Sequence, residues 1–165
     1  MSFNNIKTKA QGFTIVELLI VVVVIAILAA ITIVSYNGIT ARANTSAAQS
    51  LAANIVKKAE LYASDDSTTS YPLQGSDLTN SANSSKAYYI ASTSVNFTTG
   101  PTVLPTSSNG KNTVRFLKCA SSAQTSQAAI TASNITGIRI TYYDFSASNT
   151  KDVDTGVTTS CPAAA

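Results

Sequence analysis

The chain has no histidine and no tryptophan, and only 12% of its 165 residues are charged. The lack of histidine excludes every catalytic mechanism and every metal site that depends on an imidazole. The sequence also shows no phosphate-binding glycine loop and no nucleophile paired with a base. We therefore expect neither enzymatic activity nor a cofactor.

Charge of either sign is also scarce. Two of the eleven basic residues, Lys7 and Lys9, precede Gly12, so the rest of the chain has nine basic against eight acidic side chains. A nearly neutral domain gives little electrostatic reason to bind nucleic acid, and we expect no specific nucleic-acid partner.

What the chain does have is a long apolar run from Ile15 to Val34, broken only by Glu17 and Thr32. Twenty residues of helix are long enough to cross about 30 Å of hydrocarbon. Lys7 and Lys9 place the N-terminal end in the cytoplasm by the positive-inside tendency. The carboxylate is unexpected, because an acidic residue costs roughly 2.5–3.5 kcal/mol at the centre of a membrane helix and less near its end.

The residues around this carboxylate, Lys9 to Val22 (KAQGFTIVELLIVV), resemble the processing site of prepilins, the precursors of type IV pilins. In that family a membrane peptidase cuts after the glycine and methylates the new N-terminal residue, and a glutamate five residues into the mature chain steers assembly. The resemblance implies cleavage between Gly12 and Phe13, N-methylation of Phe13, and Glu17 as the assembly carboxylate. It covers about a sixth of the chain, roughly residues 9–36.

Physical chemistry agrees with the implied role of Glu17. Cleavage creates a positive amine at Phe13, and the Glu17 carboxylate of a neighbouring subunit would neutralise it in an apolar filament core. Glu17 and the amine of its own chain are also close enough to pair, since they are four residues apart on one helix.

Two other interpretations of the segment remain open. It could be a secretory signal peptide cleaved near Ala41-Arg42-Ala43, although its apolar core exceeds the usual 7–15 residues. It could also be a generic single-pass anchor, which has no use for a carboxylate.

The segment also departs from a common pilin pattern. Many pilins have a glycine and a proline later in this helix, where this chain has Ala26 and Val34. We therefore predict a continuous helix through residue 34, with Asn37-Gly38 as its weakest point.

The predicted fold is α+β: a long N-terminal helix packed on a small antiparallel sheet, as the resemblance to pilins also implies. We divide the chain into a leader (1–12), a transmembrane and filament-core half-helix (13–35), an amphipathic half-helix (36–63) and an extracytoplasmic globular domain (64–165). The amphipathic stripe is expected at these positions: Ile39, Ala43, Ala47, Leu51, Ile55, Ala59 and Tyr62. A solvated coiled-coil stalk fits less well, because heptads are not sustained.

Alternating or β-branched patterns predict a sheet of three to five strands, with candidates at 87–95, 113–119, 137–145 and 151–157. Residues 65–85 are rich in Ser, Thr, Asn and Asp and are expected to form a loop. The two cysteines, Cys119 and Cys161, follow the apolar segment, and an even count in an exported domain predicts one disulfide. Two free thiols are the alternative.

Two weaker patterns indicate a specific ligand, calcium in one case and DNA in the other. Asp152 and Asp154 stand at alternate positions, as in calcium loops, but the bidentate glutamate of an EF-hand is missing, so a solvated turn is the simpler interpretation. Lys111, Arg115 and Lys118 could touch DNA, although three cations in a neutral domain are more often ordinary surface residues.

These observations together predict a type IV pilin: a subunit inserted in the cytoplasmic membrane, trimmed by prepilin peptidase, passed to an assembly platform and polymerised with copies of itself into an extracellular filament. Adhesion, motility and DNA uptake are all compatible tasks. The alternatives are a pseudopilin of a type II secretion or competence system, and a membrane-anchored extracellular binding domain that never polymerises.

Overall fold

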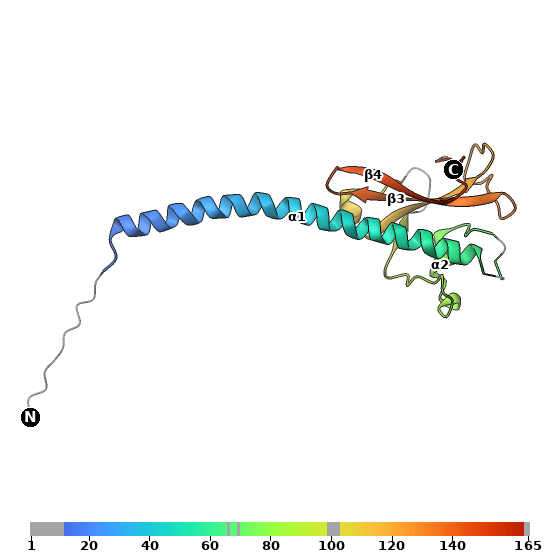
Figure 1. Ribbon diagram of the computed structural model, residues 1–165, viewed down its shortest axis with the longest axis horizontal. Coiled ribbons are helices and arrows are strands. Elements are labelled where there is room, and N and C mark those ends of the chain that lie inside the picture. Colours follow the sequence, from blue (N-terminus) through green and yellow to red (C-terminus); the bar gives the residue numbers. More distant parts are fainter. Residues whose placement is uncertain (1–11, 66, 69, 99–102, 164–165) are drawn as a thin grey trace, which may run out of the picture. The chain divides into compact units, whose positions relative to one another are not determined.

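The computed structural model in Figure 1 describes residues 12–65, 67–68, 70–98 and 103–163. A 49-residue helix, α1 (Ile15–Ala63), begins the described chain and continues through the boundary between two compact units, which lies between Ile39 and Thr40. The predicted leader, 1–12, lies outside the described residues except for Gly12.

The first unit contains the apolar part of α1. Its large apolar side chains from Ile15 to Val34 are all 48–84% exposed. The hydroxyl of Thr32 donates to the carbonyl oxygen of Ala29 at 2.9 Å, so this polar group is satisfied within the helix. The helix is continuous through residue 34, as predicted, and Asn37 and Gly38 are also helical.

The second unit is a four-stranded sheet with the later part of α1 packed against it (Figure 1). The strands are β1 (Asn96–Thr98), β2 (Thr113–Ala120), β3 (Ile135–Asp144) and β4 (Asn149–Gly156), in the order β1-β2-β3-β4. β2, β3 and β4 pair antiparallel as expected, whereas the three-residue β1 pairs parallel to β2 and makes the sheet mixed. The α+β, pilin-like architecture is therefore confirmed.

Small residues form much of the buried face of α1. Ala48, Ala52 and Ala59 are no more than 1% exposed, and they pack in one core with Ile138 and Ile140 of β3. The predicted stripe was correct at Ile55 and Ala59 but wrong at its start. Ile39 and Ala43 are exposed, and Ala48 and Ala52 are more deeply buried than Ala47 and Leu51.

The strand predicted at 87–95 is also wrong. Tyr88 is 3% exposed, and its ring packs edge-on against that of Tyr62, with centroids 4.9 Å apart. The amide of Ile90 donates to the carbonyl oxygen of Leu78 outside any strand. Aromatic and β-branched residues here anchor a loop to α1, which gives the same composition as a strand.

The region 65–85, predicted as a loop, contains two short helices, α2 (Gly75–Thr79) and the 3₁₀ helix η1 (Ser81–Asn83). A second 3₁₀ helix, η2 (Ser107–Asn109), lies between β1 and β2. A disulfide joins Cys119 of β2 to Cys161, in agreement with the expected pairing. Next to it, Ala120 and Ser160 exchange two backbone hydrogen bonds of 2.8 and 3.0 Å, so the C-terminal segment is held at the end of β2.

Asp144, at the end of β3, connects the β3–β4 hairpin to α1. Its Oδ1 accepts hydrogen bonds from the hydroxyl of Ser146 at 2.6 Å and from that of Thr45 on α1 at 3.0 Å. The ammonium group of Lys151 lies 3.0 Å from its Oδ2. The Ser146 hydroxyl and the Lys151 ammonium group hold the pKa of Asp144 well below its usual value of 3.8.

We predict that Asp144→Asn lowers the thermal unfolding midpoint of the full chain in micelles by several degrees at pH 7. Because the folded-state pKa is depressed, the stabilisation is complete above pH 3.8 and declines as the pH falls below that value. The difference in unfolding midpoint between the variant and the wild type should therefore narrow as the pH falls below about 3.8, measured by circular dichroism down to the lowest pH at which the chain stays folded. A difference in unfolding midpoint that does not change with pH would contradict the stabilising role of the Asp144 carboxylate.

Candidate functional site

The start of α1 is a reciprocal cap built by Thr14 and Glu17. The backbone amide of Thr14 donates to Glu17 Oε2 at 2.8 Å, and its hydroxyl donates to the same oxygen at 2.7 Å. In return, the amide of Glu17 donates to the Thr14 hydroxyl oxygen at 3.2 Å. This is the capping box, in which two helix amides that have no partner within the helix are satisfied by side chains.

One oxygen of Glu17 remains open. Oε1 accepts no hydrogen bond from any residue in the described part of the chain, whereas Oε2 is occupied by Thr14. The residue is exposed in the single chain, as are its helical neighbours. The carboxylate can therefore hold the helix start with one oxygen and accept a donor from outside the chain with the other.

The expected cleavage point lies immediately before this cap. Gly12 and Phe13 are exposed and precede the first helical residue, and Phe13 keeps 91% of its side-chain surface. A peptide bond must be accessible and outside regular structure to enter a protease, and the residues on both sides of the 12–13 bond are exposed and non-helical.

Residues 7–33 match the family described as the prokaryotic N-terminal methylation motif. The chain carries the methylation motif of prepilins. The matched residues include Gly12, Phe13 and Glu17 and extend to the next-to-last residue of the apolar run. No solved structure matches the fold of the chain significantly.

The prepilin motif accounts for the exposed apolar surface of α1. A prepilin is processed by prepilin peptidase and then assembled, and α1 is long and apolar enough to cross a membrane. Contiguous apolar surface of this extent is rare on a soluble monomer. Membrane anchoring before assembly explains why it is uncovered here.

The two aspartates considered for calcium binding, Asp152 and Asp154, both contact an arginine. Arg139 of β3 donates to both carboxylate oxygens of Asp154, at 2.9 and 2.8 Å, and its Nε lies 3.7 Å from Asp152 Oδ2. The hydrogen bonds lower the pKa of Asp154 and raise that of Arg139. Within the described residues, no group of three or more His, Cys, Asp or Glu side chains could hold a metal ion.

The cations considered for DNA contact do not form one surface. Arg115 is only 9% exposed and donates to the Thr141 hydroxyl at 3.2 Å. Lys118 is three residues further along β2, so its side chain points to the opposite face of the sheet. Its ammonium group donates to the carbonyl oxygen of Ile130 at 2.6 Å. Burial lowers the pKa of Lys118. Lys111 is exposed in the loop before the strand. These placements argue against a DNA-binding strand.

Sequence reasoning identified Glu17 but missed Thr14. The signal was present, because a threonine three residues before a glutamate at the start of an apolar run is the sequence signature of a capping box. The unusual carboxylate therefore has a local role in the helix in addition to any role between subunits.

We predict that Thr14→Val frays the first turn of α1. Loss of a capping hydroxyl costs about 1 kcal/mol, equivalent to roughly fivefold faster amide hydrogen exchange over residues 15–18. The measurement is exchange mass spectrometry of the unprocessed chain in micelles. Thr14→Ser keeps the hydroxyl and should exchange like the wild type. Equal exchange in the valine variant and the wild type would show that the cap contributes nothing.

Proposed function

We propose that this protein is the structural subunit of a bacterial type IV pilus and has no enzymatic activity. It enters the cytoplasmic membrane with its N-terminus in the cytoplasm and is cut between Gly12 and Phe13. It then polymerises through α1 into a surface filament. The observation that carries the proposal is the prepilin motif at the start of a helix whose apolar surface is left uncovered by the chain itself.

Copies of the chain are the natural cover for this helix outside the bilayer. In a bundle of α1 helices, the side chains from Ile15 to Val34 would bury one another, at roughly 25 cal/mol per Å² of apolar surface removed from water. The same helix is stable in lipid before assembly, since the backbone groups between its ends bond within the helix.

The geometry of Glu17 supports a charge pair between subunits. Its Oε2 is used by Thr14, and Oε1 is available for the amine that cleavage creates at Phe13 of a neighbouring subunit. A charge left unpaired in the apolar filament core would cost several kcal/mol, so subunits placed out of register would be rejected. Before assembly, the Glu17 carboxylate can pair with the Phe13 amine of its own chain.

We predict that the mature protein begins with N-methyl-phenylalanine at Phe13. Top-down mass spectrometry of the protein from its native membrane tests this directly. A start near Asn44 would instead indicate signal-peptide cleavage at Ala41-Arg42-Ala43, and a start at Met1 would indicate an unprocessed anchor. Either result would overturn the proposed function.

We also predict that Glu17→Gln prevents filament formation while leaving the helix start intact. Glutamine can serve in a capping box, so the substitution removes the charge and keeps the cap. With the amine unpaired at a cost of several kcal/mol, sheared filaments should fall by more than about 100-fold by immunoblot and electron microscopy.

The control for this substitution is Thr14→Val, which weakens the cap and keeps the charge; it should still form filaments. Normal filaments from Glu17→Gln would contradict the charge pair. Wild-type fibres that stay short and within the cell envelope would indicate a pseudopilin.

A further inference from the structure

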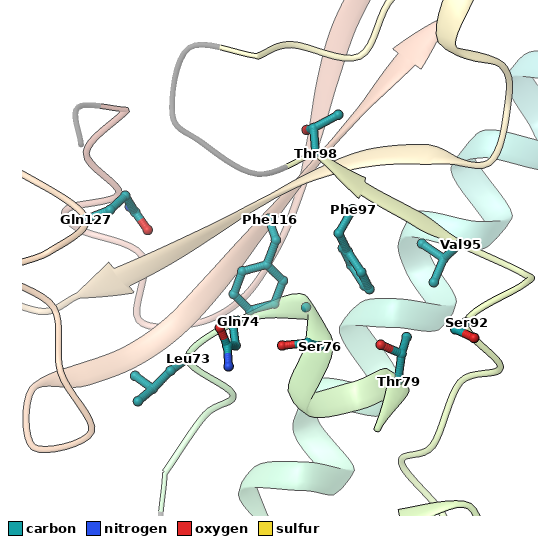
Figure 2. Close-up of a pocket in the computed structure, with 11 residues that line it drawn as sticks. Leu73, Gln74, Ser76, Thr79, Ser92, Val95, Phe97, Thr98, Phe116 and Gln127 are labelled. Atoms are coloured by element: carbon teal, nitrogen blue, oxygen red, sulfur yellow. The ribbon is translucent and has the colours of Figure 1, made fainter. Parts of the chain in front are cut away.

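A cavity of about 410 Å³ lies in the second unit, beside α2 and β1 (Figure 2). Its volume falls within the range of about 300–1,000 Å³ that is typical of small-molecule sites. Phe97 of β1 and Phe116 of β2 lie on one side, and Gln74, Ser76 and Thr79 lie on the other, at and within α2 (Figure 2). Ser92, from the loop before β1, also lines the cavity.

The aromatic side of the cavity is held in position. The rings of Phe97 and Phe116 pack edge to face, with centroids 6.0 Å apart and an angle of 84°. Phe97 also lies directly on Gly75, where an added Cβ would stand 2.3 Å from its ring. Both phenylalanines are only partly buried, so ring surface remains available to a ligand.

The opposite side of the cavity offers hydroxyl groups with free hydrogen-bonding capacity. The side chains of Ser76, Thr79 and Ser92 form no hydrogen bond with any other part of the described chain, although all three line the cavity. Gln74 adds an amide, which its contact with Asp77 Oδ1 at 3.3 Å keeps oriented. Each hydroxyl can both donate and accept.

Every described residue that lines the cavity is uncharged. A charged ligand would lose part of its hydration without gaining an ionic partner, which is unfavourable. A purely apolar ligand would bury the three hydroxyl groups without partners, at a cost of about 1–3 kcal/mol for each buried group. The lining therefore favours a neutral ligand that has an apolar face and several hydroxyl groups.

We propose that this cavity binds a neutral carbohydrate of one or two rings. The C–H face of a sugar ring packs on Phe116 and Phe97, and its hydroxyl groups exchange hydrogen bonds with Ser76, Thr79 and Ser92. This binding site goes beyond the proposed role in filament assembly and does not depend on it, because every residue of the cavity lies in the second unit.

The test is binding of the full chain to an array of neutral mono- to tetrasaccharides. The chain is solubilised in lauryldimethylamine oxide, because a sugar-based detergent would compete for the cavity. Any retained glycan is then titrated while the ring protons of the phenylalanines are followed by nuclear magnetic resonance. We expect binding that shifts these signals.

Two variants locate the site. Ser92→Leu fills the rim and should weaken binding by at least about tenfold, whereas Ser94→Leu, an exposed residue in the same turn, should bind like the wild type. Thr79→Val keeps the shape of the side chain but removes its hydroxyl, and should weaken binding by about threefold to tenfold.

Three results would overturn the proposal: no neutral glycan is retained, only charged glycans are retained, or Ser92→Leu and Ser94→Leu bind equally well. Each of these is distinguishable from a failure of the pilin assignment, which is decided separately by the mature N-terminus.

Discussion

An apolar helix surface is stable only where water cannot reach it, and this chain does not cover its own. From Ile15 to Val34 the large side chains keep about half or more of their surface exposed. The hydrophobic effect therefore requires a second environment, either lipid or other copies of the helix. Membrane insertion and assembly are two ways of meeting this one requirement, and the prepilin motif marks the step between them.

The hydrophobic effect is non-directional, so burial alone would allow helices to slide along one another. In the proposed filament, Glu17 would provide this positional constraint. A carboxylate is tolerated in an apolar environment only when it is neutralised or paired, which restricts the positions that a neighbouring helix can occupy. In the single chain, Thr14 already satisfies one of its oxygens. Local capping and the proposed charge pair between subunits thus use different oxygens of the same group.

The second unit is stabilised in a different way. Alanines at positions 48, 52 and 59 are buried in the core that α1 shares with the sheet, and Asp144 links Thr45 on the helix to the hairpin. Cys119 and Cys161 tie the C-terminal segment to β2. The cavity beside α2 and β1 is lined by other residues, between Leu73 and Gln127.

Local patterns in the sequence were enough to predict the continuous apolar helix, the processing motif, strands β2, β3 and β4, and the pairing of the two cysteines. The helix and the strands follow from periodicity and the disulfide from an even cysteine count in an exported domain, whereas the processing motif was predicted from its resemblance to prepilins; all of these are short-range or compositional signals. The Thr14 cap was predictable by the same reasoning but was missed.

Tertiary structure alone decided the rest. The aromatic residues at 87–95 could form either a strand or a loop anchor, and only the packing of Tyr88 on Tyr62 selects the loop. The parallel pairing of β1, and the deeper burial of Ala48 and Ala52 than of Ala47 and Leu51, depend on how α1 and the sheet meet. The cavity gathers residues from four separate segments. Such contacts between residues distant in sequence leave no local signal, because each residue is equally compatible with other neighbours until the core has formed.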